Sequence, residues 1–284
     1  MKCLHHSDMD GNCSGAIVYW FHKKRNEHVE CFPVNYNEDI PFEKIEKNEK
    51  VYVVDFSFVP EDYKKLLSIT DDVIWIDHHV SAIDKFKNTP IENLPGIRRN
   101  GEAGCELTWK YFYGDSKNTK IPTIVKMLGR YDVWDFSIMD KESLSALQQY
   151  CRTVDTEPYS KVWEHWLDIE YSPKKEMEIG KQYLKYRDFV WKKFLKSWGF
   201  EVELDGYKAL ACNTASVNSD FFITGENKDY DLFIPFIFDG ENWVVSLYTI
   251  KNNVDCSKLA VKYGGGGHKK AAGFVTKKLP FIEV

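Results

Sequence analysis

Short apolar runs alternate with amphipathic stretches over the first hundred residues of the chain. Each run has the length of a buried strand, and the runs lie at 2–6, 29–34, 51–55 and 73–77. The stretches between them carry apolar residues at helical spacing, as at Ile17, Trp20 and Phe21. This alternation of strands and helices predicts an α/β fold with a doubly wound, mainly parallel sheet.

The pattern changes along the rest of the chain. Helices are expected at 101–113 and 121–129, followed by a long amphipathic helix at 173–197. From residue 200 onward, Asp-Gly pairs separate runs of β-forming residues and indicate hairpins. These strands are expected at 201–204, 207–213, 232–238, 243–250 and 274–276, with a short helix at 256–263. We therefore predict a first domain at 1–172, a linker helix at 173–199 and a smaller mixed α/β domain at 200–284.

Length, charge and cysteine content limit the classes of protein to which the chain can belong. At 284 residues the chain is long enough for two cores, and its net charge of −5 excludes no class of partner. Seven scattered cysteines without CxxC spacing indicate reduced thiols and argue against a disulfide scaffold or a zinc knuckle. No apolar stretch approaches the ~18 residues of a membrane span, and no signal peptide is recognisable. We expect a soluble, cytoplasmic protein without a membrane partner.

Three of the predicted strands end in acids and imidazoles. Asp77-His78-His79 ends one strand, Asp55 ends another, and the first strand runs into His5-His6-Ser7-Asp8-Met9-Asp10-Gly11. The carboxyl ends of strands in an open α/β sheet line the ligand crevice. Although each acid alone would more commonly cap a turn, their convergence predicts a metal-assisted hydrolase. We expect Asp8 to Gly11 to form a turn, and residues 12–14 to cap the helix after it.

The acids and imidazoles have the chemistry of a dinuclear metal site. Asp8 and Asp10, two residues apart on the expected turn, can point at neighbouring ions, and Asp55 could bridge the two ions. The remaining candidate ligands are His6, His78 and Asp132. Mixed nitrogen and oxygen ligands suit Mn²⁺ better than Mg²⁺, which is the alternative ion. Two ions about 3.5–4 Å apart would clamp the attacking and leaving oxygens of a phosphoryl displacement.

A run of glycines near the end of the sequence suits phosphate binding. Gly264 to Gly267 have no side chains, so their backbone amides could approach an anion. A flexible loop before an edge strand is the structural alternative. The candidate substrate-binding residues are Gly265, Gly266, Gly267, His268, Lys269 and Arg130. Further candidates are Lys270, Arg98, Arg99, Asn213 and Ser216 for phosphate or nucleotide, and Tyr131 and Trp134 for base stacking.

Taken together, these motifs resemble those of the DHH phosphoesterase family. His6 to Gly11, Asp55, Asp77-His78-His79 and Asp132 are similar to its four ordered motifs, and Gly264 to Gly273 resembles the GGGGH motif of the DHH-associated domain. The resemblance covers nearly the whole chain. The family includes RecJ-like exonucleases, nanoRNases, cyclic dinucleotide phosphodiesterases and family II pyrophosphatases.

The resemblance implies a role for each motif residue. The implied metal ligands are His6, Asp8, Asp10, Asp55, His78 and Asp132, with Asp55 bridging two ions. His5 competes with His6, because in the pyrophosphatase-type pattern the histidine lies further before the first aspartate. Strand alternation sends these two imidazoles to opposite faces, so we expect one of them to be a ligand.

Two residues of the tripeptide are implied to act beside the metal ions. Asp77 would orient a ligand from behind. His79 would face the substrate or leaving group as a hydrogen-bond donor or general acid. Asp135 is interpreted as a structural cap.

The implied function is hydrolysis of short RNA or DNA oligonucleotides, or of linear or cyclic dinucleotides, to mononucleotides. The metal site would lie in a cleft between the domains, and the second domain would hold the substrate through the glycine run. A pyrophosphatase-like or exopolyphosphatase-like hydrolase of phosphoanhydrides is the alternative enzyme, and a non-catalytic nucleotide-binding protein is the alternative class. A homodimer formed through the helix at 173–197 is left open.

Overall fold

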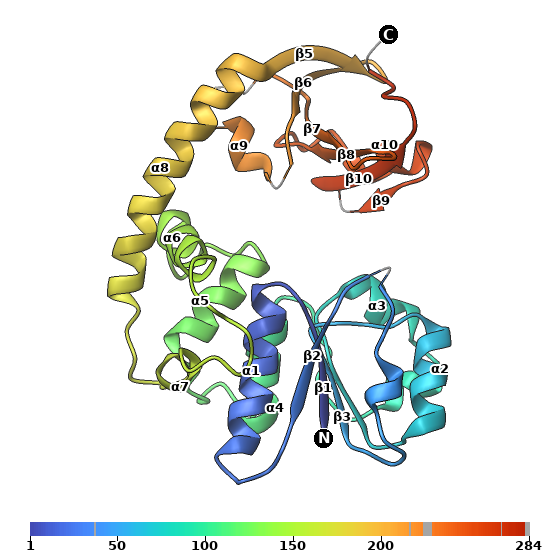
Figure 1. The fold of residues 1–284 in the computed structure, drawn as a ribbon, viewed down its shortest axis with the longest axis vertical. Helices are drawn as coiled ribbons and strands as arrows, with labels where there is room; N and C mark the ends of the chain where they lie inside the picture. The colour runs from blue at the N-terminus through green and yellow to red at the C-terminus, as the bar shows by residue number, and fades with distance from the viewer. Residues whose placement is uncertain (37, 216, 224–228, 268, 282–284) are drawn as a thin grey trace. The chain divides into compact units, whose positions relative to one another are not determined.

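The computed structural model describes residues 1–36, 38–215, 217–223, 229–267 and 269–281. The chain divides into two compact units, Met1–Leu184 and Lys185–Val284. Helix α8 (Lys174–Trp198) contains the point of division and is drawn in yellow in Figure 1. The long helix expected here is thus present. The finer division at residues 172 and 199 stays a prediction.

Four parallel strands form the sheet of the first unit, in the order β2-β1-β3-β4. They are β1 (Lys2–His6), β2 (Glu30–Val34), β3 (Val51–Val54) and β4 (Val73–Ile76). All residues of β3 and β4 are buried, as is usual for parallel strands that are covered on both faces. The expected parallel sheet is confirmed, and each strand lies at its predicted place.

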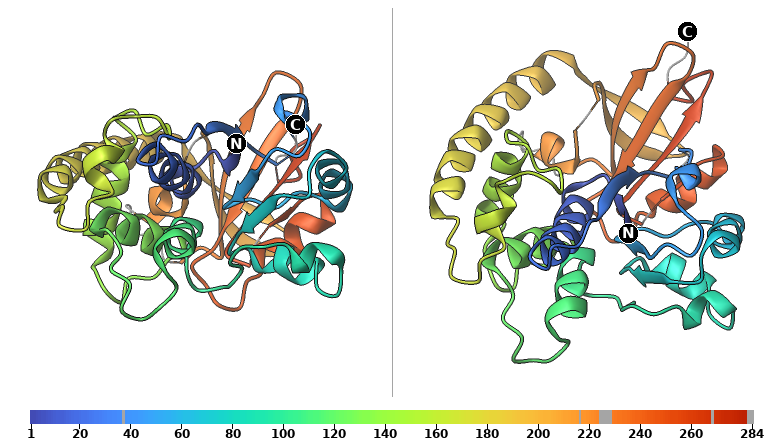
Figure 2. Two further views of the ribbon diagram at one scale, coloured as in Figure 1. Left: turned by 90° about the horizontal axis from the view of Figure 1, so that it is seen from below. Right: turned by 60° about the horizontal axis from the view of Figure 1, so that its bottom comes forward.

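Helices cover both faces of this sheet. They are α1 (Met9–Lys23), α2 (Pro60–Ile69), α3 (Val80–Lys85), α4 (Gly104–Tyr113), α5 (Thr123–Asp132), α6 (Lys141–Cys151) and α7 (Trp163–Trp166), with 3-10 turns at Phe42–Lys44 and Pro90–Asn93. Helices α1 and α4 lie on one face, and α2 and α3 lie on the other (Figure 1, Figure 2). The sheet is therefore doubly wound, as predicted.

The start of α1 differs from the prediction. The helix begins at Met9, and Asp8 is its N-cap, because one carboxylate oxygen accepts a hydrogen bond of 2.9 Å from the Gly11 amide. Asp8 to Gly11 is therefore the cap and first turn of the helix, and residues 12–14 lie inside it. The aspartate satisfies an amide that has no partner within the helix, so no later cap is needed.

The boundaries of α4 and α5 also differ from the prediction. Helix α4 begins at Gly104 instead of residue 101, and α5 continues to Asp132 instead of ending at Gly129. Arg130 is consequently helical, although it was expected in a loop. An ion pair between Glu106 and Arg130 joins the start of α4 to the end of α5 and favours these boundaries.

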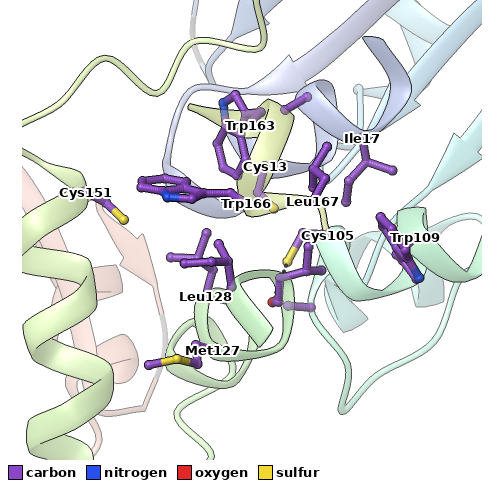
Figure 3. Close-up of a cluster of buried hydrophobic side chains, with 14 of the residues drawn as sticks. Cys13, Ile17, Cys105, Trp109, Met127, Leu128, Cys151, Trp163, Trp166 and Leu167 are labelled. Carbon is purple, nitrogen blue, oxygen red and sulfur yellow. Dashed lines mark hydrogen bonds between the residues drawn. The ribbon is translucent and has the colours of Figure 1, made fainter. Parts of the chain in front are cut away.

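The largest core of the first unit lies among its helices (Figure 3). Trp163 and Trp166 of α7 are completely buried there and pack with Cys13 of α1 and Leu128 of α5. Indole rings of this size supply much of the apolar surface that a core buries. All seven cysteines are buried and free. Within the described ranges, no helix has both the length and the apolar character needed to cross a membrane.

The second unit is built on a six-stranded mixed sheet in the order β5-β6-β7-β8-β10-β9. Its elements are β5 (Gly199–Leu204), β6 (Tyr207–Asn213), α9 (Ser219–Ile223), β7 (Leu232–Phe238), β8 (Trp243–Tyr248), α10 (Cys256–Lys262), β9 (Gly266–Gly267) and β10 (Ala271–Thr276). Strands β6 and β7 are parallel, and the other pairs are antiparallel. Asp205 and Gly206 both have positive φ and form the predicted hairpin turn between β5 and β6.

Close packing of α6 against α8 gives a test of the first unit. A Cβ atom on Gly180 would overlap the Ala146 carbonyl oxygen, so Gly180→Ala must push the two helices apart. We expect a loss of about 1–3 kcal/mol in unfolding free energy, the usual cost of overpacking, measured by urea titration. Gln182→Ala, at an exposed position of the same helix, should change stability little. Equal stability of the two variants would contradict this packing.

Candidate metal centre

The carboxyl ends of β1 and β3 bring one set of ligand atoms together. The Nδ1 atom of His6 lies 2.9 Å from Oδ2 of Asp8 and 4.0 Å from Oδ2 of Asp55. The ligand atoms of these three residues all lie within 4.8 Å of one another. Because β1 and β3 are parallel neighbours, their ends meet at one edge, as the sequence predicted.

A second set of ligand atoms adjoins the first. The Nε2 atom of His78 lies 3.5 Å from Oδ2 of Asp132 and 3.7 Å from Oδ2 of Asp10, and these atoms also fall within 4.8 Å of one another. The same Nε2 atom lies 3.1 Å from Oδ1 of Asp55. One oxygen of Asp55 therefore faces each set, which is the arrangement required of a bridging carboxylate.

Backbone geometry places Asp55 at this position. The residue follows β3 with a φ of 54°, a left-handed conformation that aspartate tolerates better than most residues. Its side chain is almost completely buried against the start of α4. A Cβ atom on Gly104 would lie only 2.5 Å from the Asp55 Cβ, so the close approach requires glycine. No local sequence pattern marks Gly104 for this role, since its contact with Asp55 joins distant segments.

The amino terminus of α4 also orients Asp10. The two carboxylate oxygens of Asp10 accept hydrogen bonds from the amides of Gly104 (2.7 Å) and Cys105 (2.8 Å). The first amides of a helix have no partner within the helix and carry partial positive charge, so they stabilise a buried carboxylate. This pairing fixes the rotation of Asp10 and leaves Oδ2 near His78.

A buried ion network supports α4 and α5 behind the centre. Glu106 accepts a hydrogen bond of 3.1 Å from the Ala103 amide and pairs with Arg130, whose Nη1 lies 3.0 Å from Oδ2 of Asp135. Both terminal nitrogens of Arg130 are thus held by carboxylates. The geometry argues against Arg130 as a substrate ligand and gives Asp135 a pairing role. In the sequence, the signal for this network is a glutamate at the third position of α4, because a glutamate there suits a capping box.

Asp77 holds the ring of His79, and it contacts the neighbouring candidate ligand His78 through the backbone amide of that residue. Its completely buried carboxylate accepts hydrogen bonds from the Ser57 hydroxyl, the His78 amide (2.8 Å) and Nδ1 of His79 (2.7 Å). Burial acts to raise the pKa of Asp77, but the hydrogen bond and charge of His79 outweigh it and lower the pKa. Asp77 is therefore an ionised acceptor that fixes the orientation of the His79 ring.

The structure separates the two histidines of β1. The ring of His5 is buried and faces α1, where a Cβ atom on Gly15 would touch it. Burial lowers the pKa of His5 to about 4, so this imidazole is neutral. His6 points to the opposite face and lies beside Asp8. Of the two candidates, His6 is thus the one that the structure brings to the cluster.

The donor atoms fit divalent cations. Within the part of the chain that is described, Nδ1 of His6, Oδ1 of Asp55 and Nε2 of His78 are buried and form no hydrogen bond of normal geometry. Burial together with the charges of Asp10 and Asp8 raises the pKa of Asp55 well above its ordinary value. Crowded carboxylates with unpaired imidazole nitrogens are the donor set of a metal with mixed nitrogen and oxygen ligands.

The glycine run of the second unit is more ordered than expected. Gly266–Gly267 forms strand β9 against β10, and the Gly265 amide donates to the Ala260 carbonyl oxygen at 2.9 Å. A Cβ atom on Gly265 would overlap the Gly273 carbonyl oxygen, so packing against β10 requires glycine here. The run is therefore partly an edge strand, and β10 begins at Ala271, earlier than predicted, because its first residues pair with β9.

Other predicted contact residues occupy varied positions. Lys269 is exposed, as are Asn213 at the end of β6 and Trp134 after α5. His268 and Ser216 lie outside the described residues. The remaining candidate cations have partners: Arg98 binds backbone carbonyl oxygens, Arg99 pairs with Glu102 and Asp115, and Lys270 binds Asn252.

Charge crowding predicts how the stability of the metal-free protein depends on pH. Burial and the charges of Asp10 and Asp8 raise the pKa of Asp132 from 3.8 to about 8. The folded state then binds this proton more tightly than the unfolded state, so stability should fall as the pH rises between those two values. In EDTA, Asp132→Asn should show a smaller loss of urea midpoint from pH 4 to 8 than the wild type. The exposed control Asp71→Asn should follow the wild type, and three parallel profiles would contradict the crowding.

Comparisons with known proteins identify a family that matches part of the chain. Residues 3–129 match the model of the DHH family, N-terminal domain. An uncharacterized protein of Acanthamoeba polyphaga mimivirus is 24% identical over 99% of this chain and 69% of its own length. The matched family segment contains all of the clustered ligand side chains described above except Asp132.

Three solved structures share the fold along nearly the whole chain. A pGpG-specific phosphodiesterase from Vibrio cholerae has a TM-score of 0.58 at 15% identity, covering 97% of this chain and 93% of its own. The DHH domain of a member of a family of ribosomal proteins has a TM-score of 0.65 at 14% identity, covering 97% and 82%. The exonuclease RecJ bound to manganese has a TM-score of 0.50 at 14% identity, covering 97% and 85%. Residues 3–129 thus match the N-terminal domain of the DHH family, and the fold of nearly the whole chain is similar to that of these three structures.

Proposed function

We propose that the protein is a metal-dependent phosphodiesterase that hydrolyses short oligonucleotides or dinucleotides to mononucleotides. The position of Asp55 supports this proposal most strongly. One of its carboxylate oxygens faces His6 in the group formed with Asp8, and the other oxygen faces His78 in the group formed with Asp10 and Asp132. Two ions bridged by one carboxylate are suited to phosphoryl displacement.

Two ions would use the ligands as follows. His6, Asp8 and Asp55 would hold one ion. Asp10, His78 and Asp132 would hold the other, with Asp55 shared. One imidazole in each set favours Mn²⁺ over Mg²⁺, and the similar RecJ structure is bound to manganese. When bound, such ions would polarise the phosphoryl oxygens and lower the pKa of a water molecule.

The pair formed by Asp77 and His79 would assist departure of the leaving group. An ionised carboxylate can only accept, so Nδ1 of His79 carries the proton in its contact with Asp77. Among the described residues, none forms a hydrogen bond with the other ring nitrogen, Nε2. A protonated His79 could therefore donate from Nε2 to the oxygen that leaves phosphorus, and Asp77 would stabilise the charged ring until that proton is transferred.

Nucleotide phosphodiesters are the substrate class that we favour. Two of the solved structures named above are a pGpG-specific phosphodiesterase and an exonuclease. In the second unit, Gly265, Gly266, Gly267, His268 and Lys269 remain our candidates for contact with the rest of the substrate. Arg130 is no longer included, because both of its terminal nitrogens are paired.

Hydrolysis in the presence of Mn²⁺ tests the proposal directly. The substrates are an RNA series from dinucleotide to pentanucleotide, linear diadenylate and pyrophosphate. We expect the wild type to release mononucleotides and Asp55→Ala to release none, because both ligand sets lose the shared carboxylate. Asp71→Ala removes an exposed aspartate from the same unit and should retain full activity.

The other outcomes of this experiment are equally informative. Release of phosphate from pyrophosphate alone would replace the phosphodiesterase by a phosphoanhydride hydrolase. Tight binding of Mn²⁺ without turnover of any substrate would contradict the proposed enzyme and favour a nucleotide-binding protein.

The role of His79 can be separated from that of the metal ligands by the choice of leaving group. With an RNA dinucleotide, His79→Ala and Asp77→Asn should lower kcat by about 10²-fold or more, because a general acid is lost. Bis(p-nitrophenyl) phosphate expels a stable phenolate that needs no proton, so its turnover should fall far less. His28→Ala, an exposed histidine, serves as the control. Equal losses on both substrates would exclude proton donation by His79.

A further inference from the structure

A pocket of about 370 Å³ opens beside the candidate metal centre, entirely within the first unit. Its walls are the segments that follow β2 and β3 together with the first turn of α2 and helix α3. The lining residues include Asn35, Tyr36, Glu38, Phe56, Phe58, Asp62 and Lys85. The volume lies near the lower end of the range of about 300–1,000 Å³ found for small-molecule sites, so it suits one compact group.

The pocket adjoins the metal ligands directly. The Phe56 ring stacks on the His6 imidazole with centroids 6.0 Å apart, and the Tyr36 ring lies 5.8 Å from the same imidazole. Ser57, another lining residue, donates its hydroxyl hydrogen bond to Asp77. A group attached to a phosphate at the centre would therefore enter the pocket without passing another element.

One wall of the pocket is an aromatic platform. The rings of Tyr36 and Phe56 lie 4.7 Å apart at an angle of 32°, and Phe58 packs against Phe56. Phe56 and Phe58 are buried, whereas Tyr36 is 50% exposed. An accessible ring that is supported from behind by buried rings is a stacking surface for a planar group such as a nucleobase.

The polar lining of this pocket includes the carboxylate of Asp62 and the ammonium group of Lys85. Asp62 lies in the first turn of α2, and within the described ranges its side chain has no hydrogen bond or ion pair. The other nearby acid, Glu38, already accepts a hydrogen bond of 3.0 Å from Asn35. Asp62 thus presents two free acceptor oxygens to whatever occupies the pocket.

The arrangement of donors on each base decides which one fits such a carboxylate. Guanine carries two adjacent N–H donors on its Watson–Crick edge, which can form two parallel hydrogen bonds with one carboxylate. Adenine and cytosine place an acceptor beside their amino donor, and uracil places carbonyl oxygens on both sides of its single donor. Each of these bases would set an acceptor against a carboxylate oxygen, which is repulsive.

We propose that this pocket binds the guanine base of a nucleotide whose phosphate lies at the metal centre. Tyr36 stacks on the base, and Asp62 accepts hydrogen bonds from its N1–H and N2–H groups. Asp62 is then a specificity-determining residue. The inference rests on the proposed function for the placement of the phosphate, while recognition of the base depends only on the pocket.

Binding of free nucleosides to the full chain in EDTA tests the pocket without metal ions, phosphate or turnover. The probes are guanosine, adenosine, cytidine and uridine, with dissociation constants measured by titration calorimetry or ligand-observed NMR. We expect guanosine to bind tighter than the others by about tenfold or more, since two charge-assisted hydrogen bonds are at stake. The wild type should also bind guanosine in preference to the other three nucleosides when all four compete in one mixture.

Matched variants identify the residues responsible. Asp62→Asn keeps the shape of the side chain but loses the charge, and should reduce guanosine binding to the level of adenosine. Asp71→Asn makes the same charge change at an exposed position outside the pocket and should change nothing. Tyr36→Ala should weaken all four nucleosides, whereas Tyr36→Phe, which keeps the ring, should not.

Two results would overturn the inference: equal affinity for all nucleosides, or guanosine binding that is unchanged in a folded Asp62→Asn protein. The outcome is independent of the hydrolysis experiment. If the protein is an active phosphodiesterase without base preference, only the assignment of the pocket is contradicted. If the protein binds guanosine but hydrolyses no phosphodiester, only the proposed function is contradicted.

Discussion

The crowding of carboxylates around Asp55 is the constraint on which the rest of the first unit depends. Asp8, Asp10, Asp55 and Asp132 converge at one sheet edge beside two imidazoles. Like charges at such distances in a partly buried site repel strongly, so the folded chain must protonate them or balance them with positive charge. In the absence of metal, the raised pKa values of Asp55 and Asp132 mean that these carboxylates are protonated more readily. Bound divalent cations would instead supply the balancing positive charge.

Much of the surrounding structure serves to hold these groups in place despite their repulsion. The amino terminus of α4 directs two amides at Asp10, and Gly104 leaves room for Asp55. Behind them, Glu106 and Arg130 tie α4 to α5, which carries Asp132 at its last turn. The cluster is therefore built from helix ends that a buried ion pair keeps in register with the sheet.

The pocket beside the centre follows from the same architecture. The segments after β2 and β3 leave the sheet next to His6 and Asp77, and their aromatic side chains form one wall. Parallel strands thus supply clustered acids and imidazoles at their ends and the walls of a pocket in the loops that follow. In the proposed function, this arrangement would couple the chemistry at a phosphate to the identity of the attached group within a single unit.

The sequence by itself determined the order of strands and helices in the first unit, because apolar periodicity depends on local positions. It also located the candidate ligands that the structure brings together, since His6, Asp55 and His78 stand at or next to the ends of recognisable strands. The tertiary structure alone decided between His5 and His6, and it alone showed that Arg130 is a structural partner of Glu106. The order of the glycine run and the contact between Gly104 and Asp55 were likewise decided in three dimensions. Each of these features depends on how close two distant segments approach, and periodicity along one chain carries no measure of that distance.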